Sequence, residues 1–213
     1  MVSPVSVLVL GFVLGMRHAT DADHVVAVST IVSRDRTLRG ALRIGSLWGL
    51  GHTLTILVVG SAIILFGLVI PPRLGLGLEL AVGLMLILLG ARSLAPHRHH
   101  HAAASTARPL LVGVVHGLAG SAAVALLVLG TLRDPAWALA YLAVFGVGTI
   151  AGMVLITLAL AMPLAAAARG FQLVERWIGV AAGLGSVAFG LLVVYRVGFV
   201  DGLFTPHPHW TPG

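Results

Sequence analysis

The sequence predicts an all-α polytopic membrane protein in which six transmembrane helices form two inverted three-helix repeats, with the first helix broken at a His/Asp motif. Three observations support this class. Hydrophobic residues make up 58% of the 213 residues and charged residues only 9%, and the mean hydropathy of +1.05 is far above that of a soluble domain. The apolar residues fall into six runs long enough to cross a bilayer. Patterns of glycine and histidine in the first three runs recur in the last three.

Composition also excludes several kinds of site and partner. The chain has no cysteine, which excludes disulfides and thiolate sites and leaves imidazole and carboxylate as metal ligands. The net charge of +6 comes from arginines that cluster in loops and form no continuous basic face. Nucleic acid is therefore not an expected partner, whereas the lipid bilayer is. The first apolar run follows Met1-Val2-Ser3-Pro4, which lacks the basic residues of a signal peptide, so we expect it to be a mature membrane segment.

The first apolar run, from Val5 to Val32, is too long for one straight span. As a continuous helix it would measure about 42 Å, against about 30 Å for the hydrocarbon core. Its middle holds the polar stretch Arg17-His18-Ala19-Thr20-Asp21-Ala22-Asp23-His24. We expect the helix to break there, because unwound backbone is tolerated at membrane depth where it lines a cavity. The alternative is a long, tilted helix.

Five further runs complete the two repeats. The second span is expected at 44–70, ending before Pro71-Pro72, and the third at 76–94, which completes a first repeat over residues 1–95. A histidine-rich linker follows at 96–108, with histidines at 97 and 99–101 that are candidates for collecting metal or simply part of a solvated linker. The second repeat, 109–200, contains spans at 109–131, 136–162 and 174–197, and a tail at 201–213 is expected outside the bilayer.

An internal repeat relates the two halves. Gly15-x-x-His18 matches Gly113-x-x-His116, 98 residues later. Trp48-Gly49-Leu50-Gly51 matches Phe145-Gly146-Val147-Gly148 at an offset of 97, and Glu79-x-x-x-Gly83 matches Glu175-x-x-x-Gly179 at 96. Chance similarity among glycine- and leucine-rich spans is the alternative. Because each half has an odd number of spans, the second half must enter the membrane inverted.

Arginine placement predicts the orientation. In a six-span arrangement nine arginines fall on one side of the membrane, against Arg73, Arg133 and Arg196 on the other. By the positive-inside rule, both termini then face outward and the histidine-rich linker is cytoplasmic. We expect a multi-pass protein of the cell membrane, inner or plasma, and find no pattern that specifies an oligomeric state.

The polar stretch of the first helix offers ligands for a divalent ion. Ionisable groups within a span cost about 2.5 to 3.5 kcal/mol each on insertion scales and therefore indicate function. His18, Asp21, Asp23 and His24 are candidates, but a regular helix cannot aim all four at one ion. Either the helix unwinds, or one carboxylate holds an imidazole in place. A further alternative is an ion pair between Arg17 and Asp21, four residues apart.

Two more histidines lie within later spans. His52 is expected near the middle of the second span and is a candidate third imidazole, and His116 matches His18 in the repeat. Each has the alternative of being a hydrogen-bonded core residue. At the positions that match Asp21, Asp23 and His24, the second half has Ala119, Ser121 and Ala122. The second repeat thus keeps the shape of the first without its charges.

The polar stretch resembles the signature of the nickel/cobalt transporter (NiCoT) family, His-x4-Asp-His within Arg-His-Ala-x-Asp-Ala-Asp-His. Leu50-Gly51-His52-Thr53 looks like that family's second histidine motif, and the stretch from His116 to Ser121 is similar to one in shorter, permease-like urease accessory proteins. The resemblance implies a secondary permease, not an enzyme, that takes up Ni²⁺ or Co²⁺ as its substrate and needs no cofactor. It also implies an ion site at His18, Asp21, Asp23 and His24, with His52 in support.

This chain departs from the family in length, since members commonly have eight spans and a larger soluble loop. Two other functions are alternatives. Metal efflux also suits a histidine-rich cytoplasmic linker. An intramembrane metal-dependent hydrolase would need a bound water and a general base. Glu79 and Glu175 are poorly placed to be that base, because they lie near the ends of their spans.

Overall fold

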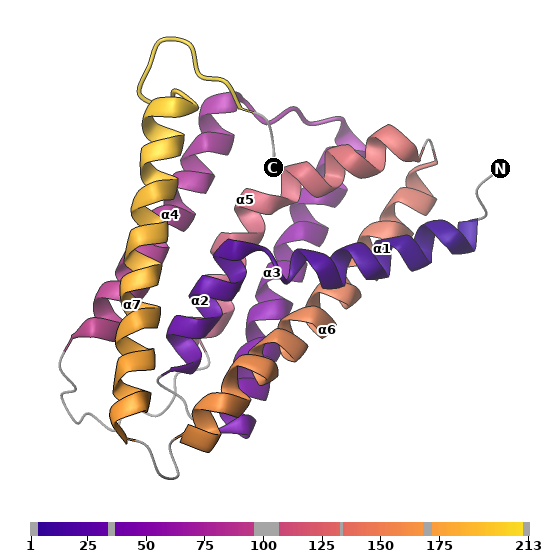
Figure 1. Ribbon diagram of the computed structural model, residues 1–213. Coiled ribbons are helices and arrows are strands. Elements are labelled where there is room, and N and C mark those ends of the chain that lie inside the picture. Colours follow the sequence, from indigo (N-terminus) through magenta and orange to yellow (C-terminus); the bar gives the residue numbers. More distant parts are fainter. Residues whose placement is uncertain (1–3, 34–36, 96–106, 133, 168–171, 211–213) are drawn as a thin grey trace.

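The computed structural model describes residues 4–33, 37–95, 107–132, 134–167 and 172–210 (Figure 1). Within these ranges every regular element is a helix, which confirms the all-α prediction. The elements are α1 (Pro4–His18), α2 (Ala22–Val32), α3 (Leu38–Phe66), α4 (Pro72–Leu94), α5 (Ala107–Thr131), α6 (Pro135–Ala167), α7 (Gln172–Tyr195) and the π-helical turn η1 (Arg196–Val200). The histidines of the expected linker, 97 and 99–101, lie outside the described residues.

Four of these helices are long and apolar enough to cross a membrane: α3, α4, α6 and α7 with η1. The pair α1 and α2 together makes a fifth candidate span. The apolar part of α5 that the structure describes, Ala107–Ala119, is shorter than a span. A multi-pass membrane protein is therefore supported, and the count of six spans stays a prediction.

The first span is broken where the polar stretch predicts it. α1 and α2 meet at an angle of 54°. The intervening turn is tightened by two i to i−3 bonds: the backbone N–H of Thr20 donates to the carbonyl of Arg17 at 2.8 Å, and that of Asp21 to the carbonyl of His18 at 3.1 Å. Asp21 then takes an extended backbone conformation, with φ −61° and ψ 147°, and α2 begins at Ala22. The straight, tilted helix is thereby excluded.

Both ends of α3 and the C-terminal end of α6 differ from the expected positions. α3 begins at Leu38 and not at Ile44, because the hydroxyl of Thr37 accepts a hydrogen bond from the N–H of Gly40 at 2.9 Å. It ends at Phe66, since Gly67 adopts a left-handed conformation with φ 62°. α6 continues through Pro163 to Ala167, whereas we expected it to end near 162. Membrane helices tolerate an internal proline when neighbouring groups satisfy the freed carbonyl.

The helices form two packed groups (Figure 1). α3 packs against both α5 and α6, and α1 lies along α6. α4 pairs with α7 on the other side of the molecule, and α2 lies between the groups, in contact with both α7 and α6. The broken first span therefore places its turn where the two groups meet.

Glycines set both the closeness and the direction of these contacts. Gly11 of α1 faces the ring of Tyr141 in α6. Farther along both segments, Ala19 faces Gly152, so the two helices run parallel. α3 and α5 are also parallel: Trp48 lies against Gly113, and Thr55 lies against Gly117. By the same reasoning α3 is antiparallel to α6, and α4 to α7. Small residues at each contact let the backbones approach, as membrane bundles require.

The tightest of these contacts recur at the spacing of the sequence repeat. A Cβ at Gly15 would overlap backbone atoms of Phe145 and Thr149. A Cβ at Gly113 would overlap backbone atoms of Trp48 and His52, which are 97 residues before Phe145 and Thr149. The contact of α1 with α6 is thus matched, residue for residue, by the contact of α5 with α3.

Buried hydroxyls add hydrogen bonds between helices. Thr53 donates to the carbonyl of Gly146 at 3.0 Å, and Ser186 donates to the carbonyl of Leu86 at 2.8 Å. Thr30 of α2 donates to Ala182 of α7 at 3.3 Å, which ties the broken span to the α4/α7 pair. Such bonds contribute about 0.6 kcal/mol each on average in membrane bundles.

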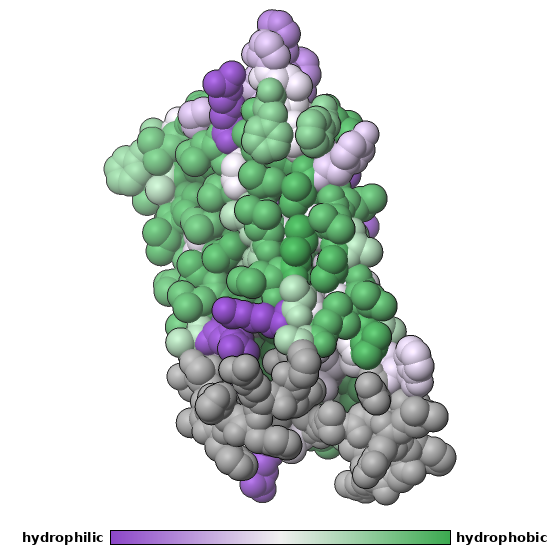
Figure 2. Space-filling view, turned by 90° about the vertical axis from the view of Figure 1, so that its left-hand side faces the viewer, coloured by the Kyte–Doolittle hydropathy of each residue, from purple (hydrophilic) through white to green (hydrophobic). Residues whose placement is uncertain are grey.

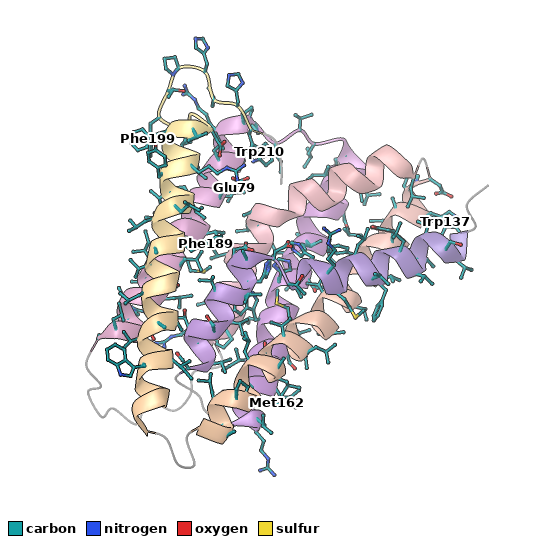
Figure 3. The ribbon with its side chains drawn as sticks, viewed as in Figure 1. Glu79, Trp137, Met162, Phe189, Phe199 and Trp210 are labelled. Atoms are coloured by element: carbon teal, nitrogen blue, oxygen red, sulfur yellow. The ribbon has the colours of Figure 1, made fainter. Side chains whose placement is uncertain are left out.

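The outer face of α4 and α7 is apolar (Figure 2). Its leucines are more than half exposed, including Leu84 at 53%, Leu184 at 55% and Leu192 at 60%. Exposed leucines on an apolar face suit contact with lipid tails. At one end of the pair the tail folds back: Trp210 donates its indole N–H to Glu79 at 2.8 Å and lies on Gly75 (Figure 3).

We predict that Gly15→Ala separates α1 from α6 and destabilises the protein by about 1 to 3 kcal/mol, because its methyl group would meet rigid backbone. Gly185→Ala is the matched control: it is also a helical glycine, and no atom lies within 4 Å of its added Cβ. Thermal unfolding in detergent measures both. An unchanged melting temperature for Gly15→Ala would contradict the close packing of α1 on α6.

Candidate metal site

Four histidines from four helices converge at the break in the first span. His18 is the last residue of α1, His24 lies in the first turn of α2, His52 in the middle of α3 and His116 in α5. His24, His52 and His116 are buried, with exposed fractions of 2%, 0% and 2%. Every candidate histidine of the sequence prediction is therefore in one cluster, apart from those in the linker and tail.

His18, His24 and His52 form a three-imidazole group. The Nε2 atoms of His18 and His52 are 3.1 Å apart, and the ring of His24 lies 4.8 Å from that of His18 and 5.1 Å from that of His52, between centroids. One ligand nitrogen from each ring lies within 4.8 Å of the other two. Nε2 of His24 is buried without a hydrogen-bond partner. Three imidazole nitrogens that face one another, including the unpaired Nε2 of His24, are suited to a divalent transition-metal ion.

The two aspartates of the motif hold the rings. Oδ2 of Asp21 lies 2.8 Å from Nδ1 of His18. Asp23 bridges two histidines, with Oδ1 at 3.1 Å from Nδ1 of His24 and Oδ2 at 2.9 Å from Nε2 of His116. A carboxylate that accepts from one ring nitrogen fixes the tautomer and leaves the other nitrogen free to bind a metal. The two alternatives for the motif thus occur together: the helix breaks, and its carboxylates orient imidazoles.

Arg17 does not take Asp21 as its partner. The side chain of Asp21 pairs with His18, and within the described ranges no ion pair joins Arg17 and Asp21. Arg17 is exposed, at the outer side of the last turn of α1. The break explains this outcome, because the i,i+4 geometry that would bring the two together requires a continuous helix from 17 to 21.

Two aromatic residues complete the walls of the site, and the sequence prediction did not include them. Trp48 is fully buried and stacks on His24 at 6.1 Å with an interplanar angle of 25°. Phe145 lies 5.6 Å from His18, between ring centroids. A signal was present, because both residues open the matched motifs Trp48-Gly49-Leu50-Gly51 and Phe145-Gly146-Val147-Gly148.

Access to the cluster is uneven. The side chain of His18 is 18% exposed and that of Asp21 52%, whereas the side chain of His116 is 1% exposed. Asp23 lies between, with its side chain 32% exposed. An ion that reaches the cluster therefore meets the carboxylates of Asp21 and Asp23 before the buried rings. The two carboxylates supply negative charge that offsets part of the charge of a divalent ion after it has lost water.

Comparison with known proteins gives one clear relationship. The chain is 36% identical to the urease accessory protein UreH of Bacillus sp. (strain TB-90) over 217 aligned positions, which cover 93% of this chain and 95% of that protein. No family model and no solved structure matches the chain.

We predict that Ni²⁺ stabilises the purified protein and that His24→Ala removes this effect. An ion at about 100 times its dissociation constant adds about 2.7 kcal/mol to the stability of the state that binds it. The measurement is the melting temperature with and without Ni²⁺, on protein purified through a tag that contains no histidine. His209→Ala, an exposed histidine of the tail, is the control and should keep the full shift. If Ni²⁺ raised the melting temperature of His24→Ala as much as that of the wild type, the cluster would be excluded as the binding site.

Proposed function

The chain belongs to the family of the urease accessory protein UreH, and on this basis we propose that it is a secondary transporter that carries Ni²⁺ or Co²⁺ into the cell. The observation that supports this most directly is the group of His18, His24 and His52 at the break of an apolar helix pair. Buried imidazoles at membrane depth suit an ion in transit, since ionisable groups there are costly unless they serve such a purpose.

The choice of ion rests on ligand chemistry and on the relative. Imidazole nitrogen with nearby carboxylate oxygen suits nickel and cobalt, and the absence of cysteine removes the thiolate ligands that favour Cu(I). The relative is named a urease accessory protein, the kind of protein that the stretch from His116 to Ser121 resembles, and the NiCoT-like signature is that of nickel and cobalt transporters. We therefore infer a role in nickel supply and not in catalysis.

We further propose that residues 1–95 and 109–200 are two inverted halves of three spans each. The parallel pairs α1 with α6 and α3 with α5 support this arrangement, since each pairs the first helix of one half with the second helix of the other. The antiparallel pairs α3 with α6 and α4 with α7 relate matching helices. Such halves give alternating access when one rocks against the other around a central site.

Transport in this scheme needs no nucleotide. The ion loses water, binds the imidazoles, and is released on the cytoplasmic side when the halves rearrange. The membrane potential contributes about 2.3 kcal/mol per charge per 100 mV to inward movement of a cation. In this proposal both termini lie outside and the linker at 96–108 lies in the cytoplasm, as the positive-inside rule favours, so that α1 descends from the outer surface toward the site.

We predict that the wild-type chain takes up radiolabelled Ni²⁺ in proteoliposomes or cells, and that His18→Ala and His24→Ala each lower uptake at least tenfold. Each change removes one of three imidazoles that bind the ion together. His207→Ala, an exposed tail histidine, is the control and should transport normally.

Two outcomes would contradict this function. Normal uptake by His18→Ala and His24→Ala would exclude the cluster from transport. Nickel sensitivity of cells that lack the gene, in place of nickel starvation, would show that the protein exports metal.

A further inference from the structure

His24 belongs to two sets of metal-binding side chains. One is the group with His18 and His52, and the other consists of Asp23, His24 and His116. In each set the ligand atoms lie within 4.8 Å of one another. The two sets share only His24, so its ring stands between them.

The two nitrogens of His24 serve different sets. Nδ1 lies 3.1 Å from Oδ1 of Asp23, whose other oxygen lies 2.9 Å from Nε2 of His116. Nε2 is buried without a partner and is left for the set with His18 and His52. The shared ring therefore presents one nitrogen to each set.

A neutral imidazole cannot serve both sets at once. The neutral ring carries one N–H and one lone pair. When Nε2 binds an ion, Nδ1 carries the proton and donates it to Asp23. When Nδ1 binds an ion, the proton is on Nε2 and that nitrogen no longer offers a lone pair. Occupancy of one set through His24 thus excludes occupancy of the other.

The repeat relates the outer members of the two sets. His18 and His116 occupy matching positions in the two halves, 98 residues apart. Each packs against the matching aromatic of the opposite half: His18 lies 5.6 Å from Phe145 and His116 lies 5.5 Å from Trp48, between ring centroids. Each set that includes His24 consequently contains one of the two matching histidines, His18 from the first half or His116 from the second.

The imidazoles of the two sets differ in exposure. The side chain of His18 is 18% exposed and its partner Asp21 is 52% exposed, whereas the side chain of His116 is 1% exposed. Among the four rings His18 is thus the one that solvent reaches, whereas the set with His116 is reached only at the carboxylate of Asp23, which is 32% exposed.

We propose that the two sets are successive stations for one divalent ion, with His24 as the ligand that passes from the first to the second. The first station is His18, His24 and His52, and the second is Asp23, His24 and His116, where the ion takes the place of the hydrogens between Asp23 and the two rings. This relay rests on the proposed transport of Ni²⁺ or Co²⁺ and assigns His116 to a step after capture.

The first test isolates the second station. His52→Ala weakens the first station, so the purified chain with Ni²⁺ should still bind one ion, and X-ray absorption at the nickel edge should show two imidazoles with added carboxylate oxygen. The double variant His52→Ala/His116→Ala should bind at least tenfold more weakly than His52→Ala. The matched control is His52→Ala/His209→Ala, which should bind as His52→Ala does. Equal affinity of the double variant and His52→Ala would overturn the second station.

The second test separates binding from transport. His116→Gln keeps an amide donor for Asp23 but is a poor metal ligand, so Ni²⁺ affinity should stay within threefold of wild type while uptake falls at least tenfold. Normal uptake would overturn the relay. A chain in which the histidines at 97, 99–101, 207 and 209 are replaced should bind one ion, and two ions would overturn the exclusion; this measurement stands even if position 116 tolerates no change.

The relay and the transport function fail differently. A wild-type chain that binds Ni²⁺ without moving it across proteoliposomes would refute the transport function and the relay with it. Uptake by wild type and equally by His116→Gln would refute the relay alone.

Discussion

The cost of placing ionisable groups at membrane depth constrains the rest of this structure. Two carboxylates and four imidazoles lie within apolar helices, and each must find a partner or an ion. Asp21 and Asp23 meet this need for three of the rings, at distances of 2.8 to 3.1 Å. What remains are ring nitrogens such as Nε2 of His24, buried and unpaired. The proposed metal binding rests on these unpaired ring nitrogens.

Close helix packing makes this cluster possible. The rings come from four helices, and imidazole is short, so the backbones must approach closely. Gly15, Gly113 and Gly117 lie directly against the backbone of the neighbouring helix, and Gly113 and Gly117 contact His52 itself. The close approach at these glycines therefore brings the helices that carry His52 and His116 together.

The two halves contribute unequally to the site. The first supplies His18, Asp21, Asp23, His24 and His52, whereas the second supplies His116 and the aromatic wall at Phe145. The matched contacts of α1 with α6 and of α5 with α3 preserve the geometry of both halves. The matched helix contacts thus carry different polar side chains in the two halves.

The sequence by itself determined the helical membrane class, the break at the polar stretch and the identity of the clustered histidines. Hydropathy and helix length are local properties, and each segment must match the bilayer on its own. The ends of α3 and α6 were missed by several residues, since the cap at Thr37 and the tolerance of Pro163 depend on neighbours. Only the tertiary structure decided that Asp23 bridges His24 and His116, that Asp21 pairs with His18 and not Arg17, and that Trp48 stacks on His24. These pairings join residues up to 93 positions apart. The partner of a side chain depends on which helices pack together and in which direction, and no single segment specifies that packing.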